Sequence, residues 1–252
     1  MSALCGFCLF TLSSCAEMMQ LSQVAMSGAA ASRPITEADN VNGLKSALNL
    51  GIEQAVARLG AENGFFGDQL LKLVLPSEAQ VIVNNLRYIP NGQDLVDKAV
   101  LALNRAAEDA VQEAGPIFKK AIREMSITDA AQILFGNENA ATSYLRAHTY
   151  TDLAQAFAPK VSKSLSKPLV AGVSTSESWN ALTSAYNTVA NSLVGQVARL
   201  TPVNVSLESY VTEKALDALF SKIEVEEKAL RTDPAARVST ILQRVFGQLD
   251  KK

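Results

Sequence analysis

The sequence has few of the side chains that enzymes use for covalent or metal chemistry. Its three cysteines, Cys5, Cys8 and Cys15, all lie near the start of the chain, and His148 is the only histidine. A domain formed by the rest of the chain therefore has no thiol for a disulfide, a nucleophile or a zinc site, and a histidine-rich metal site is excluded. We predict no catalytic set, no metal ion and no cofactor.

Charge and aromatic content are also low. The formal net charge is −2, and the 23 basic residues never form a block of three. Because binding to a phosphate backbone requires a dense basic surface, we predict no nucleic-acid partner. Aromatic residues make up 6% of the chain while alanine is abundant, which favours close-packed helices over a sheet. Phosphate-binding glycine loops, EF-hand spacing and nucleophile elbows are absent from the sequence.

The first residues are typical of an export signal. An apolar run over 3–12, too short to span a bilayer, is followed by Leu12-Ser13-Ser14-Cys15. Small residues before a cysteine resemble the bacterial lipobox, in which the cysteine becomes the lipidated first residue of the mature protein. No Lys or Arg precedes the run, so an ordinary secretion signal or a fortuitous apolar N-terminus are the alternatives.

The export signal also predicts a location. We predict a lipoprotein-type signal peptide over 1–15, lipidation of Cys15 and a flexible tether over 16–35. The residue after Cys15 is Ala16 and not the aspartate that retains lipoproteins in the inner membrane. We therefore expect a periplasm-facing protein, anchored in the outer membrane more readily than in the inner one.

Helical periodicity organises the rest of the chain. From Asp94, apolar residues such as Val96, Val100 and Leu103 recur every three or four positions, and Gly115-Pro116 ends this helix. The same period, with capping residues and helix breakers, predicts further helices over 36–60, 117–125, 128–135, 139–148, 151–165, 174–193, 207–231 and 234–249, and a short one from residue 77. We predict an all-α fold: a single irregular multi-helix bundle domain over 36–248 with short connecting helices.

Two neighbouring phenylalanines are candidates for a partner contact. Phe65 and Phe66 lie between Gly64 and Gly67. They could form an exposed apolar tip that touches lipid or protein. Alternatively, the loop folds back and its rings fill the core, which we favour because large exposed apolar patches are uncommon.

Two sets of polar residues are candidates for ligand or partner contacts. In the first set, Asn104 accompanies Arg105 and Glu108, which form a surface pair unless Arg105 is buried against Glu108 and a carboxylate from another helix such as Glu213. The second set lies close together in sequence and could line a pocket, with its histidine as acid or base. Its members are Thr142, Tyr144, Arg146, His148 and Thr149.

His148 also has a simpler interpretation. A lone histidine near the C-terminal end of a helix is more often stabilised by the helix dipole, and we prefer that interpretation.

The stretch 207–231 has acidic and basic residues four positions apart. Glu224 precedes Lys228, and Glu227 precedes Arg231, in the order that favours ion pairs on a helix. Such pairs indicate a solvated face. With Glu226, the two glutamates could instead hold a hard cation through oxygen, but their basic neighbours make this the weaker interpretation.

Several blocks, taken together and in order, resemble the bacterial domain-of-unknown-function family 4197. The resemblance covers about 35–247 and implies a single helical domain behind an export signal, often that of a lipoprotein. It implies no biochemical activity. The blocks are Asn104-Arg-Ala-Ala-Glu108, Pro116-Ile-Phe118, Asp129-Ala-Ala-Gln-Ile-Leu134, Ala140-Ala-Thr-Ser-Tyr144, Tyr210-Val-Thr-Glu-Lys-Ala-Leu216, Glu226-Glu-Lys228, Asp233-Pro-Ala-Ala-Arg237 and Val245-Phe-Gly247.

These observations leave two functional hypotheses. The first is a non-enzymatic envelope lipoprotein that binds the membrane through its lipid and displays an interaction or scaffold module to an unknown envelope protein. The second is a periplasmic protein that binds a small ligand or lipid, or an unrecognised hydrolase, with a pocket between helices. A filled core with the polar candidates in solvent would favour the first, and a cavity on which they converge would favour the second.

Overall fold

The computed structural model describes residues 33–251, and Glu37–Lys252 form one compact unit. The expected signal peptide, most of the tether and Cys15 lie outside the described residues.

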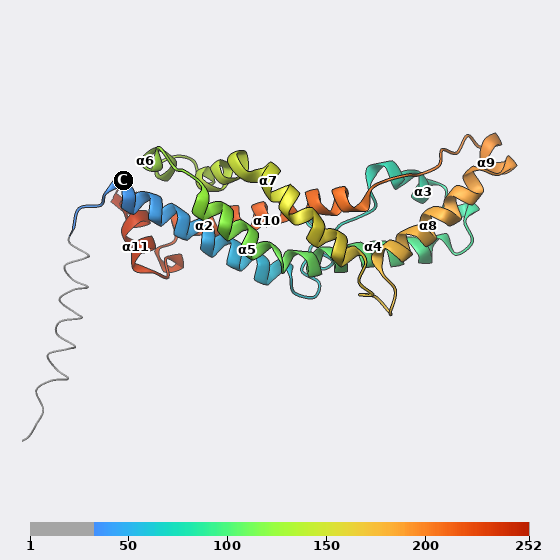
Figure 1. Cartoon of the computed structure of the whole chain (residues 1–252), viewed down its shortest axis with the longest axis horizontal. Coiled ribbons are helices and arrows are strands. Elements are labelled where there is room, and N and C mark those ends of the chain that lie inside the picture. Colours follow the sequence, from blue (N-terminus) through green and yellow to red (C-terminus); the bar gives the residue numbers. More distant parts are fainter. Residues whose placement is uncertain (1–32, 252) are drawn as a thin grey trace, which may run out of the picture. The chain divides into compact units, whose positions relative to one another are not determined.

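Within residues 33–251 the chain forms helices and no named strand, so the predicted all-α fold is confirmed (Figure 1). The helices are α2 (Glu37–Leu59), η1 (Ser77–Ala79), α3 (Gln80–Asn84), η2 (Leu86–Tyr88), α4 (Gly92–Val111), α5 (Ala114–Glu124), α6 (Ala130–Leu134), α7 (Ala140–Leu165), α8 (Thr175–Ala190), α9 (Leu193–Val197), α10 (Leu207–Thr232), η3 (Pro234–Ala236), α11 (Thr240–Phe246) and η4 (Gly247–Lys251).

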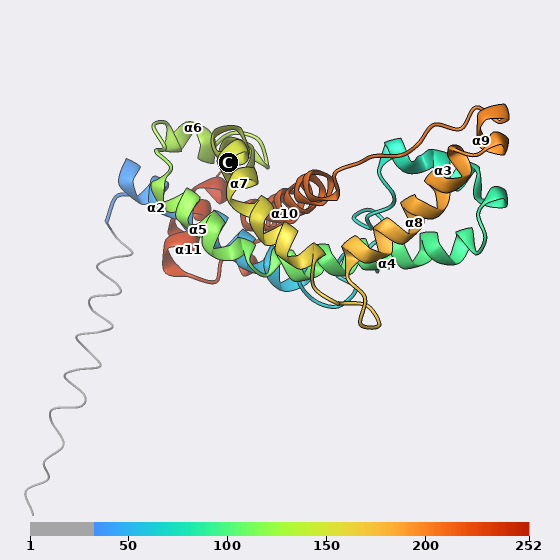
Figure 2. The same cartoon turned by 45° about the vertical axis from the view of Figure 1, so that its right-hand side comes forward.

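Helices α2 and α10 lie along each other at the centre of the core. Helix α10 also packs against α7, while α5 covers both α2 and α7. Helix α4 continues the core by packing against α7 and then α8, as both views show (Figure 2). The side chains between these helices are almost entirely apolar and fully buried, with Leu48, Ile52, Phe118 and Phe220 among the largest. The core is therefore filled by the residues of the predicted apolar stripes.

Two glycines allow α2 to approach its neighbours closely. A Cβ added at Gly43 would lie 2.6 Å from Val245 Cγ1 of α11, and one at Gly51 would lie 3.0 Å from Ile223 Cγ2 of α10. An alanine at Gly43 would require Val245 to shift, and one at Gly51 would require Ile223 to yield by a few tenths of an ångström. Small residues at these two positions set the spacing between α2 and the C-terminal helices.

The structure corrects the expected break between 139–148 and 151–165. Both stretches belong to the single helix α7, and Thr151-Asp152 do not cap a new helix. A continuous buried stripe explains this, because Leu145, Leu153 and Phe157 all face the core on the same side. Burial of that stripe outweighs the weak local preference of threonine and aspartate for a helix start.

The last predicted helix is also divided. Asp233 and Pro234 begin only the short η3, in which Asp233 Oδ1 accepts a hydrogen bond from the amide of Ala235, and α11 begins after Ser239. Arg237, between the two, turns inward: its Nε donates to the Leu230 carbonyl, and its guanidinium pairs with Asp250. That inward turn is incompatible with a continuous helix from 234.

A buried charge pair on α10 joins three helices. The prediction that Glu227 and Arg231 lie on a solvated face is wrong, since their side chains are 2% and 5% exposed. Glu227 accepts hydrogen bonds from the amides of Ala141 and Thr142, at 2.9 and 2.7 Å, in the first turn of α7. Arg231 Nη1 donates to the carbonyl of Leu134 at the end of α6.

This arrangement satisfies helix ends that would otherwise be buried without partners. A carboxylate at a helix N-terminus and a guanidinium at a helix C-terminus also match the helix dipoles. The other expected pair is different too, because Lys228 pairs with Glu138 and Glu224 accepts a hydrogen bond from Asn139. Two glutamates that look equivalent in sequence therefore have different roles.

We predict that Glu227→Ala lowers the free energy of unfolding by about 3–5 kcal/mol, because it leaves Arg231 buried without its charge partner and two α7 amides without an acceptor. Urea unfolding followed by circular dichroism measures this. The matched control is Glu224→Ala on the exposed face of the same helix, which we expect to change stability by less than about 0.5 kcal/mol. Equal effects of the two substitutions would contradict this role for Glu227.

Candidate functional site

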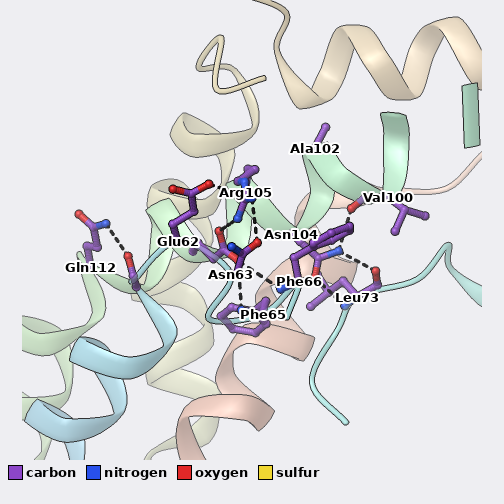
Figure 3. A network of polar contacts seen from close by, with 12 residues as sticks. Glu62, Asn63, Phe65, Phe66, Leu73, Val100, Ala102, Asn104, Arg105 and Gln112 are labelled. Carbon is purple, nitrogen blue, oxygen red and sulfur yellow. Dashed lines mark hydrogen bonds and ion pairs between the residues drawn. The ribbon is translucent and has the colours of Figure 1, made fainter. Parts of the chain in front are cut away.

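The first candidate set holds the loop between α2 and the segment before α3. Glu108 on α4 is 4% exposed, and its Oε1 accepts hydrogen bonds from the amides of Phe65 and Phe66, each at 3.1 Å. Its Oε2 accepts from Arg105 Nη1 at 2.6 Å. Phe65 is fully buried, so its ring fills the core as expected, while Phe66 is partly buried beside Lys72 (Figure 3).

Arg105 fixes the same loop from its outer side. Its Nη2 donates to Asn63 Oδ1 at 3.0 Å and pairs with Glu62 at 3.4 Å (Figure 3). The additional carboxylate therefore comes from the loop and not from Glu213 on another helix. Asn63 has a φ of +66°, a left-handed backbone conformation that asparagine tolerates better than most residues. Arg105 thus stabilises a sharply turned loop.

Asn104 performs the equivalent role for the next segment. It is fully buried, and its amide group accepts from the Leu73 amide at 2.9 Å and donates to the Leu73 carbonyl at 2.8 Å (Figure 3). A third hydrogen bond runs to the carbonyl of Val100 at 2.7 Å. Asn104 and Glu108 are therefore engaged by the backbone, and neither faces a cavity in the described structure.

Tyr144 and His148 lie together on an open groove. Their rings stack with centroids 4.0 Å apart, and the Tyr144 hydroxyl donates to the carbonyl of Ser126 at 2.8 Å. His148 Nδ1 lies 2.8 Å from the Tyr144 carbonyl, which can only accept, so Nδ1 carries the proton. In the neutral ring, Nε2 is then the nitrogen left as an acceptor. The expected position of His148 near a helix C-terminus is wrong, because α7 continues to Leu165.

The groove runs between α5 and α7 and has a volume of about 570 Å³. Its lining combines apolar side chains with charged groups of both signs. We call it the α5–α7 groove. It is lined by Ile117, Lys120, Ala121, Glu124, Met125, Ser126, Thr128, Tyr144, His148, Thr149, Asp152, Leu153 and Ala156.

Arg146 lies away from this groove, on the side of α7 that faces α10. It forms an ion pair with Asp217, and its guanidinium carbon lies 4.9 Å from the ring centroid of Tyr150 and 5.1 Å from that of Phe220. The second candidate set is therefore divided: Thr149 joins Tyr144 and His148, Arg146 lines a second groove, and Thr142 hydrogen-bonds to Glu227.

One comparison with known proteins gives a match. The family described as protein of unknown function (DUF4197) matches residues 34–247, which include every helix from α2 to α11. The chain belongs to this family. No curated protein and no solved structure matches it. The predicted resemblance is thus confirmed, and the family description adds no activity.

The described residues of this DUF4197 member contain neither a metal-binding cluster nor a membrane-spanning helix. Among residues 33–251 no group of three His, Cys, Asp or Glu side chains could hold a metal ion, and no helix there is long and apolar enough to cross a membrane. The three glutamates near 224–227 have separate partners, since Glu226 pairs with Arg58, Glu224 with Asn139 and Glu227 with the helix ends.

Sequence reasoning missed the residues of α10 that face Arg146. Thr212, Glu213 and Asp217 line the second groove with Tyr150 of α7. Glu213 and Asp217 are four positions apart and therefore share a helical face, and Tyr150 follows Arg146 by four positions. Those spacings were visible, but the pairing of α7 with α10 was not, because it depends on tertiary packing.

We predict that Glu108→Ala lowers the free energy of unfolding by about 2–4 kcal/mol, because three hydrogen bonds to a buried carboxylate are lost. Hydrogen exchange at the amides of Phe65 and Phe66 should accelerate more than at core amides of α10. Glu62→Ala is the control, since the Glu62 side chain is 80% exposed. Unchanged exchange at the two phenylalanine amides would show that Glu108 does not hold this loop.

Proposed function

We propose that this DUF4197 member is a lipid-anchored envelope protein whose helical domain is a non-enzymatic interaction module. The anchor is Cys15, and the module faces the periplasm, with the outer membrane as the preferred site. The proposal for the anchor rests on the small residues before Cys15 and on Ala16 after it.

The observation that carries the interaction role is how the polar candidates are used. Asn104, Glu108 and Glu227 are buried, and each binds backbone groups of another segment. Their hydrogen-bonding capacity stabilises the fold and leaves little for catalysis. Tyr144 and His148, in contrast, line a surface groove that a partner can reach.

The α5–α7 groove fits a segment of another envelope protein that presents apolar side chains. Its lining includes Ile117, Ala121 and Leu153, which offer apolar contact. His148 Nε2 offers an acceptor for a backbone N–H of that segment, because Nδ1 is occupied by the Tyr144 carbonyl. Lys120 and Asp152 add charges of both signs to the groove. They therefore favour a partner segment whose remaining side chains are polar and uncharged over one that is highly charged.

A small-ligand-binding protein is the second candidate function. It is favoured by the groove between α7 and α10, where a buried hydroxyl of Thr212 has no hydrogen-bond partner in the structure.

The anchor is tested by Cys15→Ser. We expect the variant to lose palmitate labelling and to move from the membrane fraction to the soluble fraction of the envelope, because the thiol that carries the lipid is gone. Fractionation with quantitative immunoblotting measures this, and His148→Ala is the control that should remain in the membrane fraction. Palmitate label that persists on Cys15→Ser would exclude this anchor.

The interaction role is tested by photo-crosslinking in intact envelopes. We expect a crosslinking amino acid at His148 to give a discrete higher-mass adduct with an envelope protein. Ala147 is the matched control, since it is exposed on the same helix and lines neither groove. Adducts of equal yield from both positions, or none from His148, would contradict a docking role for the α5–α7 groove.

A further inference from the structure

The second groove is formed by one face of α7 and one face of α10. Its volume is about 570 Å³, equal to that of the α5–α7 groove, but its lining is richer in acidic groups. We call it the α7–α10 groove. It is lined by Arg146, Tyr150, Ala154, Gln155, Ala158, Glu208, Ser209, Thr212, Glu213 and Asp217.

Thr212 is exceptional in this groove. The residue is 5% exposed, and its Oγ1 is the one buried side-chain oxygen or nitrogen without a hydrogen-bond partner among the residues that the structure describes. Three other helical threonines, Thr149, Thr183 and Thr232, donate to the carbonyl four residues earlier. Buried hydroxyls are nearly always paired, so this exception indicates a missing partner at a surface that a ligand can line.

The charges of the groove are unbalanced. Arg146 is already paired with Asp217 and packed against aromatic rings, whereas within residues 33–251 no ion pair or side-chain hydrogen bond neutralises Glu208 or Glu213. The surplus is therefore two negative charges. Burial first, and then Asp217 and Glu213, raise the pKa of the Tyr150 phenol, and burial and Glu213 raise that of Tyr210. Of the two tyrosines only Tyr150 lines the groove, and the smaller contributions of Asp217 and Glu213 to its shift agree with a negative potential there.

We infer that the α7–α10 groove binds an alkylammonium group, with Glu208 and Glu213 as its charge partners and Thr212 Oγ1 as a neutral acceptor. An ammonium has three donors and no acceptor, which matches two carboxylates and a hydroxyl oxygen. Ala154 and Ala158 offer apolar contact to the methylene groups that carry it. Arg146 is the one cationic side chain in the lining of this groove, and Asp217 already neutralises it, so the groove does not suit an anion.

The same chemistry has two sources, a free diamine or polyamine and a lysine side chain of a partner protein. Calorimetric titration of the full chain distinguishes them with two probes, 1,4-diaminobutane and a short peptide with blocked termini in which one lysine is the sole charged residue. Binding of the diamine alone supports a free amine, and binding of the peptide alone supports a partner lysine. Failure of both probes to bind at millimolar concentration overturns the inference.

Two substitutions test the assigned residues. Glu213→Gln should weaken binding of whichever probe binds by about tenfold or more, since it removes a charge-assisted contact. Thr212→Val keeps the shape but removes the hydroxyl, so it should weaken binding several-fold while it raises the melting temperature. Glu124→Gln in the α5–α7 groove is the control and should leave the affinity unchanged.

The combined effect of Thr212→Val on melting temperature and on affinity distinguishes a ligand-binding hydroxyl from a packing defect. A higher melting temperature with unchanged affinity would mean that the hydroxyl is a packing defect, and it would remove Thr212 from the site. Unchanged affinity in both Glu213→Gln and Glu208→Gln would overturn the alkylammonium site. This inference deepens the second candidate function, small-ligand binding, and does not depend on the α5–α7 groove or on the anchor, so it can fail or hold independently of the lipid-anchored interaction role.

Discussion

The buried pair of Glu227 and Arg231 is the interaction on which the arrangement of this domain depends. Without it, the first amides of α7 and the last carbonyls of α6 would be buried at their junctions with α10 without charged partners. Helix α10 therefore supplies both the acceptor for the first amides of α7 and the donor for the last carbonyls of α6. Because both groups are almost fully buried, the geometry of α6, α7 and α10 is fixed to within hydrogen-bonding distance.

The position of α7 in turn creates both grooves. One side of α7 faces α5 and carries Tyr144 and His148, and another side faces α10 and carries Arg146 and Tyr150. The polar residues that look most like a site in the sequence, Asn104 and Glu108, instead bind backbone atoms inside the fold. Two surface grooves of the described chain thus lie along α7, and Glu227 holds this helix from its first turn.

The helical fold was predictable because it rests on local periodicity, and the site was not because it rests on helix pairing. The stripe of α2 and the breaker Gly60 predicted the end of α2 accurately, since each acts within one turn. Gly115-Pro116 was less accurate, because α4 already ends at Val111 and Pro116 lies in the first turn of α5, where proline is tolerated. Glu224 and Glu227 have the same spacing to a basic residue, yet only Glu227 is buried. Likewise, Thr151-Asp152 resembles a helix start in the sequence. In the structure α7 continues through these residues, because buried apolar side chains precede and follow them on one face. Such outcomes depend on neighbours that are distant in sequence.

The most direct test of this account is a chemical-shift map of the isotopically labelled full chain, recorded before and after addition of detergent-solubilised envelope components. The account predicts that perturbed amides cluster along α7 and on the facing residues of α5 or α10, while the amides of Phe65, Phe66 and Leu73 stay unchanged. Perturbations centred on the loop around Phe65, with none along α7, would contradict the claim that the buried polar residues are structural and that α7 carries the binding surface.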